Sequence, residues 1–325
     1  MQTKKTIGLL LKIGIVFFAL SFLYQQLVSK SRIESFNIEH IFFQLQKNSS
    51  LIVIVILMMF LNWFLESLKW RFLISKIENL TIKRSIRAVF SGITVSAFTP
   101  NRIGEYAGRV FCLEKADRIQ GVLITVIGSM AQLLTTIIFG LLGILLLPNL
   151  MPKFDILLSE IVFAYPIMLF IVVLLIVLLI TLFLNASIFS VVLSKFQFLS
   201  KFAKYNQVFS FYNFSDLLEV LLYSIARYIV FTTQFFILLR VFEVNIIYNE
   251  AIILIAVMLF VISIIPSIAI TEIGVRGSVA LFLFGLVSSN IVGILSATFV
   301  MWVINLLLPA MLGTIFIFTL KFFRQ

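Results

Sequence analysis

Residues 161–184 read IVFAYPIMLFIVVLLIVLLITLFL. The stretch contains no charged side chain, and it is long enough to cross a hydrocarbon core about 30 Å thick, which takes roughly 20 apolar residues in a helix. A helix that is apolar all round must be buried in a protein core or solvated by lipid. The stretch therefore predicts a membrane span, and the sequence on either side of it extends the same pattern.

The whole chain has the composition of a membrane protein. Of its 325 residues, 62% are hydrophobic and only 12% are charged, and its mean hydropathy is +1.16. Soluble domains carry about 25% charged residues, because they must cover their surface with polar groups. Further apolar runs occupy residues 7–28, 50–74, 119–147, 217–239 and 291–320. These runs predict one all-α, polytopic integral membrane domain over residues 1–325, with about six full spans.

Two more apolar stretches, residues 85–111 and 251–285, are interrupted. The first contains SAFTPNRIGEYAGR at 96–109, and the second contains IPSIAITEIGVRG at 265–277. We expect structural helix breaks at Pro100, Gly104, Pro266 and Gly274. A helix break at membrane depth is tolerated where protein or a wet cavity covers it, and transporters place two such segments in corresponding halves. The spacing favours an inverted repeat, and whether each segment is re-entrant or fully spanning stays open.

The broken stretches also carry paired charges. Arg102, Glu105 and Arg109 are spaced i, i+3 and i+7, so they share one face of a helix that starts after the first proline. Glu272 and Arg276 have the i, i+4 spacing of an ion pair. Together the two sets leave a surplus positive charge, and the planar guanidinium of arginine suits phosphate oxygens. We predict that these residues bind a lipid headgroup; the alternative is that they are interfacial charges that only fix topology.

Further charged residues lie within predicted spans. Arg227 sits in the middle of 217–239 and needs a partner, because a lone charge at that depth is costly. Glu272 or Glu105 is the expected partner, which adds Arg227 to the predicted headgroup site. Glu66 and Lys69, three residues apart near one end of 50–74, are expected to pair with each other as an interfacial anchor.

The distribution of basic residues predicts the orientation. The formal net charge is +11, and most lysines and arginines outside the spans fall in segments on one side. Both termini are therefore predicted inside, in the cytoplasmic (inner) membrane. Anionic lipid is the expected partner of these loops rather than nucleic acid. The chain has one histidine and one cysteine, so neither a metal site nor a cofactor is expected.

The first broken stretch resembles a family motif. Residues 100–105, PNRIGE, followed by Arg109, are similar to the P-x-R-x-G-E signature of the lysylphosphatidylglycerol synthase transmembrane-region family, also called flippase-like proteins. The second stretch, from Pro266 to Arg276, resembles that family's P-x-x-G-G-x-G-x-R-E motif. It departs from the motif because IAIT replaces the paired glycines and Glu272 precedes Arg276. These departures predict either a different ligand or a weaker site.

The resemblance implies lipid translocation: a charged or glycosylated headgroup would move between the leaflets. Well-known relatives carry an added aminoacyl-transferase domain, and this chain ends five residues after its last predicted span. We therefore expect no catalytic residues and no lysyl transfer. The expected partner is a membrane phospholipid or a polyprenyl-linked lipid. The alternative functions are a membrane accessory protein and a polyprenyl-phosphate-dependent transferase subunit, with a membrane-bound transferase partner or a homo-oligomer both left open.

Overall fold

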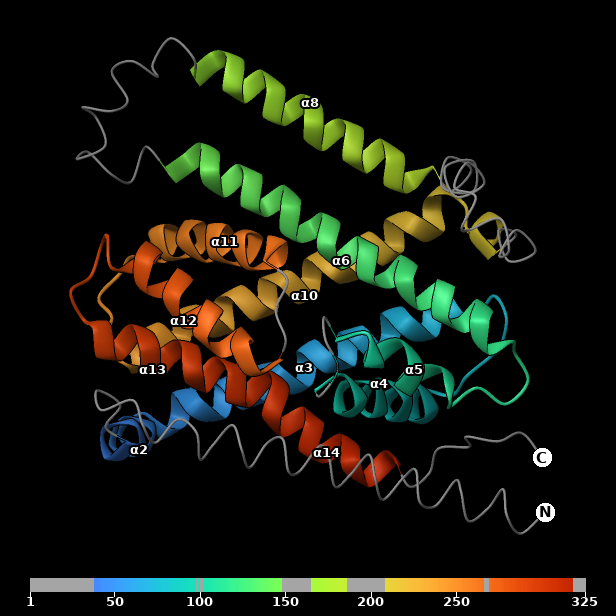
Figure 1. Ribbon diagram of the computed structural model, residues 1–325, viewed down its shortest axis with the longest axis horizontal. Helices are drawn as coiled ribbons and strands as arrows, with labels where there is room; N and C mark the ends of the chain where they lie inside the picture. Colours follow the sequence, from blue (N-terminus) through green and yellow to red (C-terminus); the bar gives the residue numbers. More distant parts are fainter. Residues whose placement is uncertain are drawn as a thin grey trace.

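The computed structural model describes residues 38–97, 99, 102–147, 165–185, 208–265 and 269–317, and over these residues the chain is helical with no strand (Figure 1). The predicted first span, residues 7–28, lies outside the described residues. So do Pro100 and Pro266, the two prolines at which helix breaks were predicted.

Long apolar helices form most of the bundle. They are α3 (Ser49–Ile74), α6 (Arg118–Leu146), α8 (Tyr165–Leu184), α10 (Phe214–Val241), and α13 (Ile291–Trp302), which continues through a π-helical turn (Val303–Leu307) into α14 (Leu308–Ile317). Among the described residues, 5 helical segments are long and apolar enough to cross a membrane. They coincide with five of the predicted spans, which confirms a polytopic all-α membrane protein.

The interrupted stretches form two helical hairpins. The first consists of α4 (Ile82–Ser96) and α5 (Gly104–Val110), and the second of α11 (Tyr248–Ile264) and α12 (Ala269–Phe284). The two helices of each hairpin pack on each other and turn back toward the end from which they came (Figure 1). None of the four helices is among the 5 segments that are long and apolar enough to be candidate spans. Both interrupted stretches thus have the hairpin shape expected of re-entrant segments.

The hairpins enter the bundle from opposite ends. In Figure 1, α4 and α5 enter where α3 ends and α6 begins, whereas α11 and α12 enter where α10 ends and α13 begins. Each half of the bundle is thus a long helix, a hairpin and another long helix, and the second half runs in the opposite direction to the first. This is the inverted repeat that the spacing of the two breaks favoured.

Glycines allow the first hairpin to close tightly. A Cβ atom on Gly108 of α5 would lie 2.6 Å from the Cα of Gly92 in α4, so the two backbones are in direct contact. Gly104 is the first residue of α5, and a Cβ there would lie 2.5 Å from the carbonyl oxygen of Val95. The prediction of a break at Gly274 is wrong, because this residue lies within α12 and its helix continues past it.

A buried carboxylate fixes the loop that follows the first hairpin. Glu78, between α3 and α4, accepts hydrogen bonds from the backbone N–H groups of Glu114, Lys115 and Ala116 at 2.9–3.2 Å. Arg84 of α4 donates to the same carboxylate at 3.1 Å. Burial raises the pKa of Glu78, but the three N–H donors and the Arg84 charge outweigh burial and hold it below its usual value. The carboxylate therefore ties the start of α6 to the end of α3.

Candidate functional site

Glu66 of α3 is the centre of a buried ionic network. Its carboxylate lies 2.7 Å from Nη1 of Arg109 in α5 and 2.8 Å from Nζ of Lys69, and it also contacts Nη1 of Arg227 in α10. The side chains of Glu66, Lys69 and Arg109 are at most 6% exposed. Three cations thus share one carboxylate inside the bundle, where an unpaired charge would be costly.

The cations also contact neutral groups on neighbouring helices. Lys69 donates to the carbonyl oxygen of Gly128 at 3.2 Å. Arg227 donates to Oδ1 of Asn62 at 2.9 Å and to Oε1 of Gln132 at 3.1 Å. The guanidinium of Arg227 also lies 5.3 Å from the centre of the Trp63 ring, within cation–π range. The network therefore joins α3, α5, α6 and α10.

The first hairpin adds a further ion pair to the network. Glu105 and Arg109, one turn apart in α5, are in contact, and Arg109 bridges Glu105 to Glu66. The expected single helix face of Arg102, Glu105 and Arg109 is not observed, because α5 begins at Gly104, after Arg102. Arg102 instead has a left-handed backbone with a φ of 57°, which is uncommon for a residue with a Cβ.

Arg102 connects the two hairpins. Its Nη2 lies 2.9 Å from Oε1 of Glu272 at the start of α12, and Nη2 of Arg276 lies 2.7 Å from the same oxygen. The Glu272–Arg276 pair expected from the i, i+4 spacing is confirmed. The tips of two hairpins that enter from opposite ends of the bundle are therefore joined by one carboxylate between two arginines.

The charges of the site do not cancel. Around Glu66, three cations (Lys69, Arg109 and Arg227) face two anions (Glu66 and Glu105), and around Glu272 two arginines face one carboxylate. Each cluster keeps one surplus positive charge. Two buried donors, Nε1 of Trp63 and Nε of Arg109, have no hydrogen-bond partner among the described residues. Surplus charge and free donors together suit a ligand with anionic acceptor oxygens.

Sequence reasoning found most of these residues but misjudged two relationships. The partner of Arg227 is Glu66, rather than the expected Glu272 or Glu105. Glu66 and Lys69 do pair, as expected, but they lie in the buried centre of the network rather than at an exposed interface. Their spacing was visible in the sequence, whereas the two arginines that converge on Glu66 come from helices distant along the chain.

The described part of the chain holds no group of three or more His, Cys, Asp or Glu side chains arranged to bind a metal ion.

Residues 7–313 match the family model described as "Lysylphosphatidylglycerol synthase TM region". The chain belongs to this family. No curated protein and no solved structure is significantly similar to it. In this member of the lysylphosphatidylglycerol synthase TM region family, the described residues of the two family-like motifs lie at the hairpin tips, and Arg102 and Glu272 bring them into contact. The family membership and the multi-span fold establish a membrane protein of lipid or envelope metabolism.

Proposed function

We propose that the protein moves a phospholipid with a phosphate-bearing headgroup from one leaflet to the other. One observation carries the proposal: two clusters of charged side chains, each with a surplus positive charge, lie beside and at the point where the hairpins from opposite ends of the bundle meet. Broken helices of this kind build binding sites at the centre of transporters. A site reached by hairpins from both ends is suited to receive a headgroup from either leaflet.

The residues have separate roles in this proposal. Arg102 and Arg276 contact the phosphate, because both already present guanidinium donors to a shared carboxylate at the hairpin tips. Glu272 and Glu105 hold the arginines in position. Arg227 and Arg109 supply the remaining positive charge around Glu66. No group in this scheme acts on a covalent bond of the lipid, so the proposal is transport without catalysis.

The proposed membrane is the cytoplasmic membrane, with both termini inside. Basic side chains gather at the end of the bundle where α3 ends and α6 begins: Lys76, Lys83, Arg84, Arg87, Lys115 and Arg118. The opposite end, between α10 and α11 and before α3, holds Arg240 and Lys47. Cytoplasmic loops carry an excess of Lys and Arg, which supports placing the first of these two ends inside.

Transport by the purified protein tests the proposal. The protein is reconstituted in vesicles that contain a fluorescent anionic phospholipid, and the fraction that crosses is measured by chemical quenching of the outer leaflet. Arg102→Ala and Arg276→Ala should each slow the transfer about tenfold or more, since a charge-assisted hydrogen bond contributes about 1.5–3 kcal/mol. Arg240→Ala, at an exposed arginine at the end of α10, is the control and should transfer lipid at the wild-type rate.

Two results would contradict the proposal. One is an unchanged rate in well-folded Arg102→Ala and Arg276→Ala proteins. The other is a wild-type protein that moves lipid no faster than empty vesicles while it co-purifies with a fixed membrane transferase, which would favour an accessory function.

A further inference from the structure

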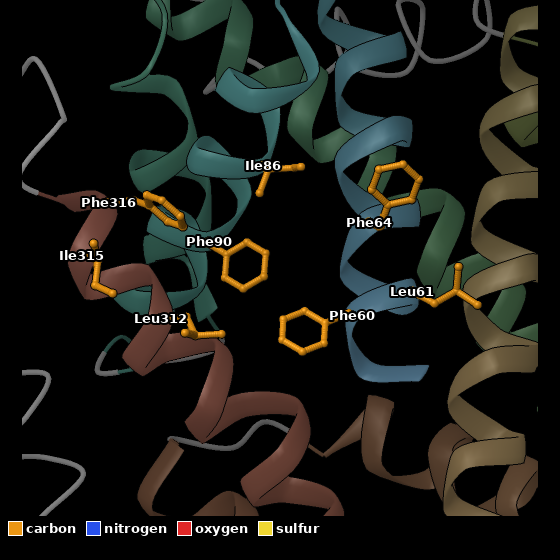
Figure 2. Close-up of a pocket in the computed structure, with 8 residues that line it drawn as sticks. All are labelled: Phe60, Leu61, Phe64, Ile86, Phe90, Leu312, Ile315 and Phe316. Carbon is orange, nitrogen blue, oxygen red and sulfur yellow. The ribbon is translucent and has the colours of Figure 1, made fainter. Parts of the chain in front are cut away.

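An apolar groove lies between α3, α4 and α14 (Figure 2). Its volume is about 540 Å³, within the usual range for ligand pockets. Aromatic and aliphatic side chains from all three helices line it, and those that carry the argument are Phe60, Phe64, Phe90, Leu312, Ile315 and Phe316. No charged residue contributes to the lining. The groove is therefore built for a hydrocarbon group.

The position of the groove places it in the membrane. Phe60 and Phe64 lie near the middle of α3, and Ile315 lies in α14, and both helices belong to segments long and apolar enough to span. Phe60 is 47% exposed and Ile315 is 65% exposed, so part of the lining faces outward. From the middle of α3 the groove extends toward the end of the bundle where α4 begins and α14 ends. It thus lies at the depth of the acyl chains of one leaflet.

The groove shares a wall with the ionic network. The ring of Phe90 packs against Trp63, with 6.5 Å between the ring centres. Trp63 in turn lies under the guanidinium of Arg227 at 5.3 Å, and its Nε1 is buried without a hydrogen-bond partner in the described structure. One pair of aromatic rings therefore separates the hydrocarbon-lined space from the surplus positive charge.

We propose that this groove holds an acyl chain of the phospholipid whose headgroup binds the ionic network. The inference rests on the proposed function and adds the place from which the lipid is taken. An anionic amphiphile complements both sides of the Trp63–Phe90 wall, because its tail matches the apolar lining and its phosphate matches the excess cations. A helix from residues 7–28 or from a second copy of the chain would fill the apolar side but would bring no anion to the other.

Photo-crosslinking in vesicles tests this occupant. The full chain is reconstituted with phosphatidylglycerol that carries a diazirine in the middle of one acyl chain, and the adducts are mapped by peptide mass spectrometry. Adducts should concentrate in the peptides that contain residues 60–64 and 312–316. Phosphatidylcholine with the same modified chain is the second probe, and it should label these peptides several-fold less because its headgroup is zwitterionic.

A variant whose side chain fills the groove provides a second test of the proposed acyl-chain site. Leu312 lines the groove and is 36% exposed, so Leu312→Trp adds bulk in the groove without burying a polar group. Leu312→Trp should lower the adduct yield several-fold and slow lipid transfer. Leu174→Trp, at a residue of α8 that is 56% exposed and lies outside the groove, should change neither measurement.

The outcomes separate this inference from the proposed function. Adducts spread evenly over the outer surface would overturn the groove, and so would equal labelling by both probes. A chemical cross-link from the groove to residues 7–28 or to a second copy would also overturn it. If the groove is not labelled while Arg102→Ala still slows transfer, the headgroup site is supported and the acyl-chain site in the groove is refuted. If transfer is insensitive to both arginine variants, the proposed function itself fails.

Discussion

Arg102 and Glu272 join the two hairpin tips through a single hydrogen-bonded ion pair of 2.9 Å. The two residues are 170 positions apart in the chain, and they belong to halves that run in opposite directions. Arg102 reaches Glu272 from a left-handed backbone conformation just before the start of α5. Uncommon backbone conformations of this kind concentrate at functional sites, and the contact therefore links the geometry of one hairpin to that of the other.

The energy of this contact is expected to be small. The Arg102 side chain is 38% exposed, so solvent screens the pair. A double-mutant cycle with Arg102→Ala and Glu272→Ala should give a coupling energy of about 1 kcal/mol or less in the free energy of unfolding. The measurement is unfolding of the purified protein in mixed micelles. A coupling several times larger would show that the tips are locked together rather than held by a weak contact.

Glu66 should matter far more for stability. Glu66→Gln removes the charge that compensates Lys69, Arg109 and Arg227 while nearly preserving the shape of the side chain. We expect a loss of about 3–5 kcal/mol, because the fully buried Lys69 and the partly buried Arg227 lose their shared counter-charge and Arg109 keeps only Glu105. Thermal unfolding in detergent gives the measurement. Glu219→Gln, at a partly exposed carboxylate on α10, is the control, and equal melting temperatures for the two variants would contradict the central role of Glu66.

Close packing within the first hairpin predicts a contrast between two glycines. Gly108→Ala should destabilise the protein by about 1–3 kcal/mol, because the new Cβ would lie 2.6 Å from the backbone of Gly92. Gly274→Ala should be neutral or should stabilise by up to about 1 kcal/mol, since nothing lies within 4 Å of the added Cβ and alanine favours the helix. Melting temperatures of both variants check this contrast, and a harmless Gly108→Ala would refute the close contact of α4 and α5.

The Glu78 carboxylate predicts an acid-sensitive fold. Its pKa in the folded protein is lowered by hydrogen bonds from three backbone N–H groups and by Arg84, despite the opposing effect of burial. A carboxyl group whose folded pKa lies below its unfolded pKa stabilises the fold fully above the unfolded value. That stabilisation is lost as the pH falls through the folded pKa.

The corresponding measurement is the melting temperature as a function of pH. The wild-type protein should lose more stability than Glu78→Gln when the pH is lowered from neutral, since the variant has no carboxyl group to protonate at this position. Parallel curves for the two proteins would show that Glu78 does not contribute to the acid sensitivity.

The sequence was sufficient for the membrane class and for the order of the helices. Length and hydropathy alone locate α3, α6, α8, α10 and the α13–α14 segment, because the bilayer imposes a minimum span on any helix that crosses it. The prolines and glycines that interrupt residues 85–111 and 251–285 also predicted the positions of both hairpins. Gly274 was misread as a break because an isolated glycine in a helix has the same appearance in sequence as a glycine that ends one.

The contacts of the site were less accessible from sequence. Spacing revealed the local pairs Glu66–Lys69 and Glu272–Arg276, which depend only on helix periodicity. The pairing of Glu66 with Arg109 and Arg227 depends on how α3, α5 and α10 pack, and hydropathy carries no information about it. Arg102 was assigned to a helix that in fact begins two residues later, at Gly104, which changed its partner from its own helix to the opposite hairpin.

The shared oxygen of Glu272 makes the hairpin contact separable. Since Oε1 of Glu272 accepts from Arg276 as well as from Arg102, departure of Arg102 leaves the carboxylate neutralised by a residue of its own helix. A phosphate that captures Arg102 therefore exchanges one counter-ion for another and leaves no bare charge in the membrane. In the proposed transport, the tips part and rejoin while the Glu272 carboxylate remains paired with Arg276.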